Sequence, residues 1–140
     1  MSIDLSKLIT AEDKLEKAKA SKVAQLSAAC EGFIKQGFLC SALGEPHLYP
    51  LNEKDQLNLA SSSAESILAQ GEVGWTTPFW CSLEGTWEMR EHTAEQIQQV
   101  GREAKAFVLE NMMLNDQLAH QVSRAATIQE VESIEFIPTE

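Results

Sequence analysis

Residues 93–125, TAEQIQQVGREAKAFVLENMMLNDQLAHQVSRA, decide the fold class of this chain. Thr93 and Gln96 have the spacing of a capping box, in which two side chains bond the free N–H groups at a helix start. Seam residues then recur at alternating steps of three and four. They are Ile97, Val100, Ala104, Phe107, Asn111, Leu114, Leu118, Gln121 and Ala125. This period of 3.5 predicts a long helix with the seam of a coiled coil.

The same seam is the predicted contact surface for a partner. Asn111 and Gln121 are polar positions on it, and such positions lower stability but select register and strand number. The pattern fits pairing within one chain and pairing between chains. We expect self-association or docking through one set of residues: Ile97, Val100, Ala104, Phe107, Asn111, Leu114, Leu118 and Gln121.

Two other helices are expected before this one. Thr10 and Asp13 form a variant capping box, and Gly37 ends the amphipathic stretch that follows. Asn52 caps a shorter helix over residues 53–70, although its run of serines competes for backbone hydrogen bonds. The expected apolar stripe of the shorter helix is Leu57, Ala60, Ala64, Ile67 and Leu68.

Between the helices, short apolar runs separated by turn residues predict antiparallel strands. The expected strands are residues 38–42, 47–49, 79–83 and 87–89. Gly85 supplies the positive φ of a tight hairpin. A two-residue turn would set Trp80 opposite Met89, and a three-residue turn would set Leu83 opposite Trp87. Both registers stay open.

Core packing is the predicted role of the large side chains in this middle region. These are Phe38, Tyr49, Leu57, Leu59, Trp75, Trp80 and Trp87. Clustered tryptophans can also stack on bases or sugars. Base stacking needs surrounding basic charge, and Arg90 is the basic residue nearby. We therefore prefer core packing, with a carbohydrate-binding module as an alternative.

Together these elements predict an α+β fold, with two long amphipathic helices and a shorter middle helix around a small antiparallel β region of hairpins. We expect a single domain over residues 1–140. Its expected parts are an N-terminal helix (1–36), β hairpins with the middle helix (37–92), and a coiled-coil-like helix with a short final helix (93–135).

The net charge of the chain is −10, and the acidic excess lies entirely after residue 40, since residues 1–40 are almost neutral. Such a surface repels phosphate backbones and anionic lipids, so we expect neither nucleic acid nor membrane as a partner. No run approaches the roughly 18 apolar residues of a membrane span. The N-terminus lacks the pattern of a secretory signal, and we expect a cytosolic protein.

The residues that could carry chemistry form no recognisable motif. Cys30, Cys40 and Cys81 lack a C-x-x-C spacing and predict free, buried thiols. No His–Cys pair has the short spacing of a structural zinc site. Nucleophile-elbow and phosphate-loop motifs are also absent from the sequence. We therefore expect a non-enzymatic protein with no catalytic residue, metal or cofactor.

Several short motifs are shared with one known family. They are Gly37-Phe38, Ser41-Ala42-Leu43-Gly44, Tyr49-Pro50, Asp55-Gln56-x-Asn58-Leu59, Trp75-Thr76, His92-Thr93-Ala94-Glu95-Gln96 and Ala125-Ala126-Thr127. Over about residues 12–135 the chain resembles a domain that recurs in proteins encoded around the tail-fibre genes of tailed bacteriophages.

The resemblance implies a domain found both within fibre proteins and as a small separate assembly protein, with no catalytic residues attributed to it. This chain has no long fibrous extension, so we expect an adaptor or assembly chaperone. Its expected partner is a tail-fibre or baseplate protein, in the host cytoplasm during assembly. A permanent structural component of the virion tail is the alternative.

Overall fold

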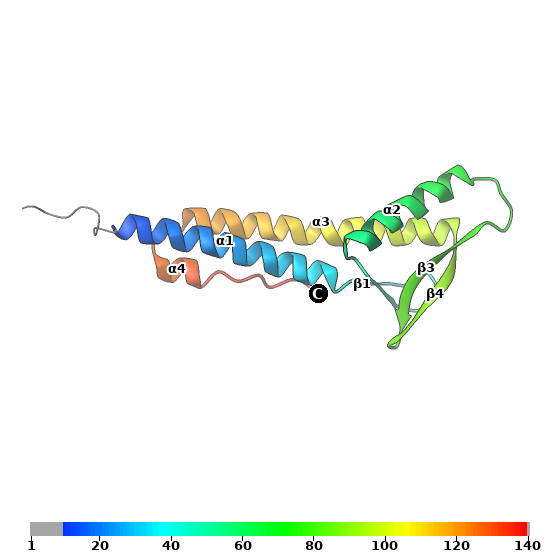
Figure 1. The fold of residues 1–140 in the computed structure, drawn as a ribbon, viewed down its shortest axis with the longest axis horizontal. Coiled ribbons are helices and arrows are strands. Elements are labelled where there is room, and N and C mark those ends of the chain that lie inside the picture. The colour runs from blue at the N-terminus through cyan, green and yellow to red at the C-terminus, as the bar shows by residue number, and fades with distance from the viewer. Residues whose placement is uncertain (1–9, 140) are drawn as a thin grey trace, which may run out of the picture. The chain divides into compact units, whose positions relative to one another are not determined.

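The computed structural model describes residues 10–139 and has the predicted α+β fold (Figure 1). Helices and strands follow one another in this order: α1 (Ala11–Lys35), β1 (Phe38–Cys40), β2 (His47–Tyr49), α2 (Glu53–Leu68), β3 (Thr76–Leu83), β4 (Thr86–Thr93), α3 (Ala94–Arg124) and α4 (Ile128–Glu132). The long helices, the shorter middle helix and the hairpins of an antiparallel sheet are all present, which confirms the predicted fold class.

The chain divides into two compact units. One, the terminal unit, is formed by the described residues up to Glu31 and from Asn111 onward. The other, the sheet unit, is Gly32–Glu110. Long helices α1 and α3 each contribute residues to both units, so the units do not coincide with the three consecutive segments expected from the sequence.

In the terminal unit, the first part of α1 packs with the last part of α3 and with α4 (Figure 1). Its core consists of Leu26, Leu118, Val122, Ala125 and Val131. Two lysines of α1 bond carbonyls near helix C-termini: Lys19 Nζ donates to the Ser123 carbonyl at 2.9 Å, and Lys22 Nζ donates to the Glu132 carbonyl at 3.3 Å. Cations at these positions also interact favourably with the negative end of the helix dipole.

The helix starts agree with the capping patterns in the sequence. Thr93 Oγ1 accepts from the Gln96 N–H at 3.2 Å, and Gln96 Oε1 accepts from the Thr93 N–H at 2.8 Å. Thr10 Oγ1 accepts from the Asp13 N–H at 3.1 Å. Asn52 is the N-cap of α2. Side chains at these ends satisfy backbone groups that the helices cannot, and this defines where each begins.

The sheet unit is built on an antiparallel sheet with strand order β1-β2-β3-β4. Strands β3 and β4 are joined by a two-residue turn in which Glu84 has φ 49° and Gly85 has φ 85°. Two positive φ values define a type I′ turn, whose twist matches that of the strands. The turn sets Trp80 opposite Met89, which decides between the two registers.

One face of the sheet is buried. Side chains alternate between faces along a strand, and the buried side chains on this face are Phe38, Cys40, His47, Tyr49, Thr77, Phe79, Cys81 and His92. On α3, Phe107 stacks against Phe38 with ring centroids 5.7 Å apart. The first half of α3 thus covers this face and forms the second layer of the unit.

Candidate partner-binding surfaces

Within the sheet unit, the contact surface predicted on α3 is buried by the chain itself. Ile97 and Val100 are 0% exposed, and Ala104 is 5% exposed. Phe107 is partly buried and lies against Phe33, with ring centroids 5.6 Å apart, and against Phe38. These side chains are part of the sheet unit's core and are not available to a partner in this conformation.

The rest of that predicted surface lies in the terminal unit. Asn111 and Leu118 are buried and Leu114 is partly buried, whereas Gln121 is exposed. Cys30 Sγ contacts the Asn111 carbonyl at 3.4 Å. A helical period shows which side of a helix is buried but not which chain buries it. Here the chain's own elements cover most of the seam, and Gln121 is its exposed member.

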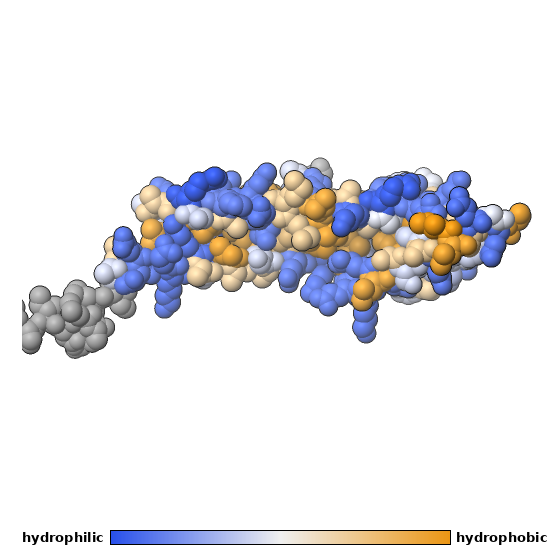
Figure 2. Space-filling view, turned by 90° about the horizontal axis from the view of Figure 1, so that it is seen from above, coloured by the Kyte–Doolittle hydropathy of each residue, from blue (hydrophilic) through white to orange (hydrophobic). Residues whose placement is uncertain are grey.

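Helix α2 faces the opposite way from the prediction. Leu57, expected in the core, is 73% exposed, and Ile67 and Leu68 are 60% and 86% exposed. The buried side chains of α2 are Leu59, which confirms its predicted core role, together with Ser62 and Ser66. In Figure 2, apolar side chains gather over α2 among hydrophilic ones.

Small residues explain this orientation of α2. Gln98 Nε2 on α3 donates to Ser66 Oγ at 3.0 Å, so the buried hydroxyl has a partner. A Cβ at Gly101 of α3 would lie 2.6 Å from Ser63 Oγ. Serine on one helix and glycine on the other therefore allow close approach and polar bonding between α2 and α3. The serines expected to weaken the helix form its packing side.

The tryptophans of the hairpin are also turned outward, which corrects their predicted core role. Trp80 and Trp87 are 43% and 38% exposed, and their near-parallel rings stack with centroids 6.0 Å apart. Trp75 is partly buried. Phe38 and Tyr49, at 6% and 0% exposed, do belong to the core as predicted. Successive side chains of a strand point to opposite faces of the sheet. Phe38 and Tyr49 lie on the face that α3 covers, and Trp80 and Trp87 lie on the other face.

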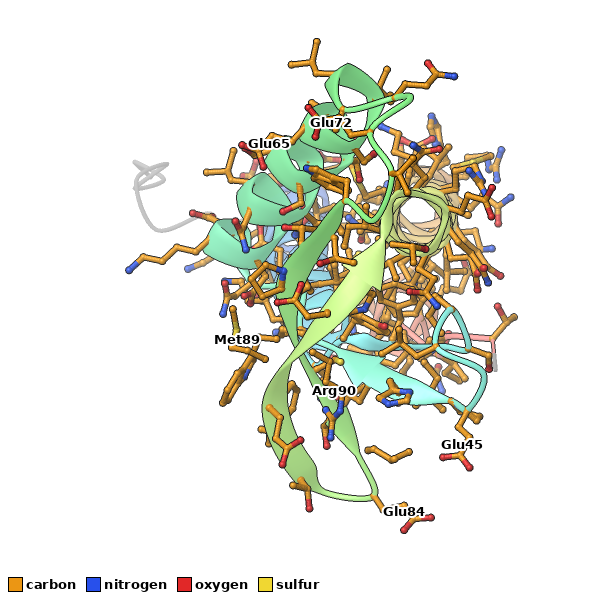
Figure 3. The ribbon with its side chains drawn as sticks, turned by 90° about the vertical axis from the view of Figure 1, so that its right-hand side faces the viewer. Glu45, Glu65, Glu72, Glu84, Met89 and Arg90 are labelled. Carbon is orange, nitrogen blue, oxygen red and sulfur yellow. The ribbon has the colours of Figure 1, made fainter. Side chains whose placement is uncertain are left out.

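Other apolar side chains share the face with the tryptophans. Cross-strand pairing runs from Leu39 through Leu48 and Ser82 to Trp87, and paired residues point to the same side of a sheet. In Figure 3, Met89 and Arg90 project to opposite sides of the hairpin. We define the outer sheet face by its four exposed large apolar residues: Leu39, Trp80, Trp87 and Met89.

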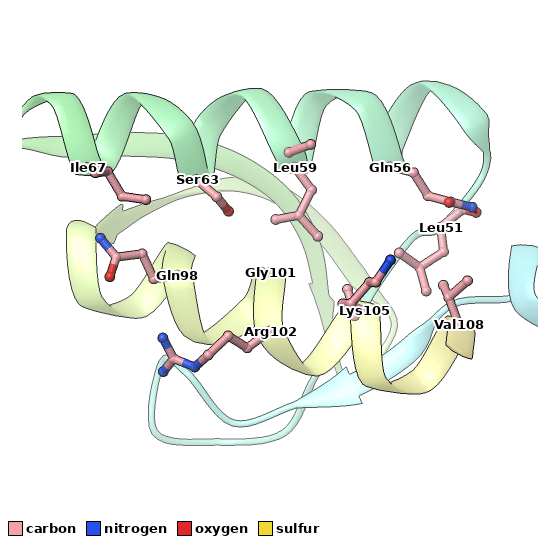
Figure 4. Close-up of a pocket in the computed structure, with 12 residues that line it drawn as sticks. Leu51, Gln56, Leu59, Ser63, Ile67, Gln98, Gly101, Arg102, Lys105 and Val108 are labelled. Carbon is pink, nitrogen blue, oxygen red and sulfur yellow. The ribbon is translucent and has the colours of Figure 1, made fainter. Parts of the chain in front are cut away.

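A groove between α2 and α3 is the second candidate surface (Figure 4). Its volume is about 600 Å³. The lining residues are Leu51, Gln56, Leu59, Ala60, Ser63, Ile67, Gln98, Gly101, Arg102, Ala104, Lys105 and Val108. The lining is mostly apolar, includes the cations Arg102 and Lys105, and contains no carboxylate. We call this the α2–α3 groove.

In a comparison with protein families, residues 17–137 match a model described as a domain of unknown function (DUF4376). The chain belongs to this family. A search of curated proteins found no match. A search of solved structures found none either.

Beneath the outer face, the DUF4376 domain contains a buried polar pair that the sequence did not predict. Tyr49 Oη lies 2.7 Å from His92 Nε2, and His92 Nδ1 lies 2.8 Å from the Arg90 carbonyl oxygen. Since a carbonyl only accepts, Nδ1 carries the proton and Nε2 accepts from the Tyr49 hydroxyl. Burial lowers the pKa of His92 and raises the pKa of Tyr49. The pair is a neutral link between β2 and β4.

The thiols are free and buried, as predicted. Burial raises the pKa of Cys40 to about 11 and also raises the pKa of Cys30, so both are protonated near neutral pH and are poor nucleophiles. Among residues 10–139, no group of three or more potential ligands could hold a metal ion. No helix in the described part of the chain is long and apolar enough to cross a membrane.

Proposed function

We propose that this chain is a non-enzymatic interaction protein of the tail-fibre region of a tailed bacteriophage, an adaptor or assembly chaperone that binds the tail fibre. The resemblance of its motifs, from Gly37-Phe38 to Ala125-Ala126-Thr127, supports the setting. The outer sheet face is the observation that carries the binding role. On this proposal the protein acts in the host cytoplasm during virion assembly.

The outer sheet face has the properties of a contact surface. Met89 is 57% exposed and pairs across the hairpin with Trp80, and Leu39 at the β1 edge of the same face is 66% exposed. Tryptophan and methionine are enriched in protein interfaces, and contiguous exposed apolar patches commonly mark interaction sites. The buried side chains on the other side hold the strands in place. A partner would therefore meet a preformed surface and would lose little conformational entropy on binding.

The test is co-purification of this chain with the tail-fibre protein of the same phage. Met89→Lys and Trp80→Glu put charge on the outer sheet face, and each should abolish co-purification because an unpaired charge would be buried. Leu57→Lys is the matched control, since Leu57 is also an exposed apolar residue but lies on α2. It should leave fibre binding intact. Phe107 and Leu114, on the predicted seam of α3, are partly buried by the chain itself, so charged substitutions there would test packing and binding together.

Equal co-purification of the wild type and Met89→Lys would overturn the assignment of this face, and absence of any complex with the fibre would overturn the function. Mass spectrometry of purified particles separates two roles. A chaperone is absent from mature virions, whereas a structural component of fibre or baseplate is present at fixed copy number.

Carbohydrate binding is a second candidate because the Trp80–Trp87 stack is exposed. Aromatic rings stack on the apolar faces of sugars as they do on other flat groups. Tryptophan fluorescence is the direct probe. A saturable change on adding an oligosaccharide from a glycan array, lost in Trp80→Ala, would favour this function. An unresponsive signal across the array would reject it.

A further inference from the structure

Helix α2 carries apolar surface in excess of what its own unit buries. Ala60 and Ile67 line the α2–α3 groove, and Leu57 and Leu68 continue the stripe onto solvent. At 73% and 86% exposure, these two leucines would remove much apolar area from water if a partner covered them, at roughly 25 cal/mol per Å². The groove and the stripe form one continuous apolar surface, since their residues are neighbours on the helix.

The charge of the groove is opposite to that of the chain. Arg102 and Lys105 line it in a chain of net charge −10. The ion pairs among the described residues are Arg90–Glu88 and His120–Asp116, so neither groove cation is paired with a carboxylate of residues 10–139. In Figure 4 the Lys105 side chain extends toward Leu51 and Gln56, at one end of the groove. The groove thus fits an apolar helix that brings its own acids.

Helix α2 itself has that chemistry. Its acids are Glu53, Asp55 and Glu65, against one base, Lys54. At 100° per residue, Glu53 falls on the same side of the helix as Leu57 and Ala60, at the N-terminal end of the exposed stripe. The exposed side of α2 therefore combines an apolar stripe with the carboxylate of Glu53 at its N-terminal end, and this carboxylate is complementary to the cations of the groove.

We propose that α2 of a second copy of this chain occupies the α2–α3 groove. The contact is reciprocal, as in a two-fold symmetric dimer in which the same patch is used by both chains. Helices α2 and α3 of the two copies then form a four-helix bundle, with Leu57, Ile67 and Leu68 in its core. This inference goes beyond the proposed function and uses a different surface from the outer sheet face.

The symmetry indicates which charges meet. A two-fold axis across the groove makes the two α2 helices antiparallel, so Glu53 of the partner subunit lies at the Ile67 end of α2. In Figure 4 the Arg102 guanidinium extends toward this end, where Gln98 and Ile67 lie. Glu53 of the partner subunit is thereby placed beside Arg102. Each dimer contains this pair twice.

Sedimentation equilibrium of the full chain tests the proposal. The wild type should show a concentration-dependent monomer–dimer equilibrium that weakens as salt is raised. Leu57→Glu should give a monomer at all concentrations. Arg102→Glu and Glu53→Arg should each raise the dimer Kd about tenfold or more, because like charges then face each other. The double variant Arg102→Glu with Glu53→Arg should restore dimerisation.

Leu39→Glu is the matched control, because it adds the same charge to an exposed leucine outside the groove and should leave the dimer intact. Far-UV circular dichroism and thermal melts check that every variant is folded. A wild-type chain that stays monomeric at high concentration would overturn the proposal, as would a dimer that Leu57→Glu and the single charge reversals leave unchanged. Loss of fibre binding in Met89→Lys with an unchanged dimer would show that the two surfaces act separately.

Discussion

Helix α2 and the first half of α3 lie side by side in the sheet unit but bury opposite kinds of side chain. On α3 the buried positions are apolar, as Ile97 and Val100 show. On α2 two of the three buried positions are serines, while Leu57 and Leu68 face outward. Both helices have a clear apolar stripe in sequence. The stripe of α3 forms part of the core, whereas the stripe of α2 is exposed.

The difference shows that an apolar stripe identifies surface that will be covered without identifying what covers it. Phe107 is covered by Phe33 and Phe38 of the same chain. The serine side of α2 packs inward within the unit. Ser63 lies close to Gly101, and Ser66 accepts a hydrogen bond from Gln98. Exposed apolar patches of this kind commonly mark interaction sites.

The largest expected effect is loss of core packing on α3. Ile97→Ala removes a side chain that is 0% exposed and should lower the free energy of unfolding by about 2–5 kcal/mol. Ile67→Ala makes the same chemical change at a residue 60% exposed and should cost less than about 1 kcal/mol. Urea denaturation at concentrations low enough for a monomer measures both. Equal losses would break the contrast between the helices.

A smaller effect is expected from exchanging the two sides of α2. Ser66 is 1% exposed and accepts from Gln98, so Ser66→Leu both overfills the contact and leaves the amide without its partner. We expect a loss of about 1–3 kcal/mol in the same assay. Leu57→Ser, at a residue on the outward side, is the control and should change stability little. A stabilised Ser66→Leu variant would mean that the serine side is not the packing side.

The smallest effect concerns pH, and it belongs to the buried side of the sheet unit. Because the folded-state pKa of His92 lies below its ordinary value of 6.5, the unfolded chain binds a proton that the folded chain does not. Neutral, buried His92 therefore contributes to the free energy of unfolding. That contribution is fully present above pH 6.5 and is lost as pH falls from 6.5 through the folded-state pKa.

Urea denaturation between pH 8 and pH 5 measures the slope of the free energy of unfolding against pH. His92→Phe should reduce the slope, and it should also be less stable at pH 7.5 because the Tyr49 hydroxyl loses its partner, by about 1–3 kcal/mol. His47 is close enough to interact electrostatically with His92, so the difference between the two slopes reports His92 together with this interaction. The α2 variant Leu57→Ser should keep the wild-type slope. An unchanged slope in His92→Phe would contradict the assignment.

Most of the fold could be predicted because its signals are local. Capping side chains such as Thr93 and Asn52 act within one turn, and the Glu84-Gly85 turn depends on two residues. Helix starts, strand runs and the hairpin therefore follow from short stretches of sequence. The division into two units could not be predicted from local signals, because α1 and α3 each run through both units and their helical pattern is not interrupted at the boundary.

The candidate surfaces were predicted poorly for a related reason. Trp80, Trp87 and Leu57 are the side chains that hydropathy assigns to a core, and all three are exposed. Tyr49 and Leu59 were assigned correctly by the same rule. Nothing in the residues themselves separates the two groups, since alternation and periodicity define two sides of a strand or helix without naming the inner one.

The sequence by itself determined the α+β class, the order of its elements, the helix starts and the amphipathic character of each helix. These depend on hydrogen bonds and turns between residues close in the chain. The strand ends differ from those expected: β1 is shorter than 38–42, and β3 and β4 run over Thr76–Leu83 and Thr86–Thr93, beyond the expected 79–83 and 87–89. Only the tertiary structure decided which stripe becomes core, because that depends on contacts between distant segments: Gly101 against Ser63, Phe107 against Phe38, and Tyr49 with His92. Once those contacts form, the apolar side chains of α2 and the outer sheet face remain outside, where a second chain can reach them.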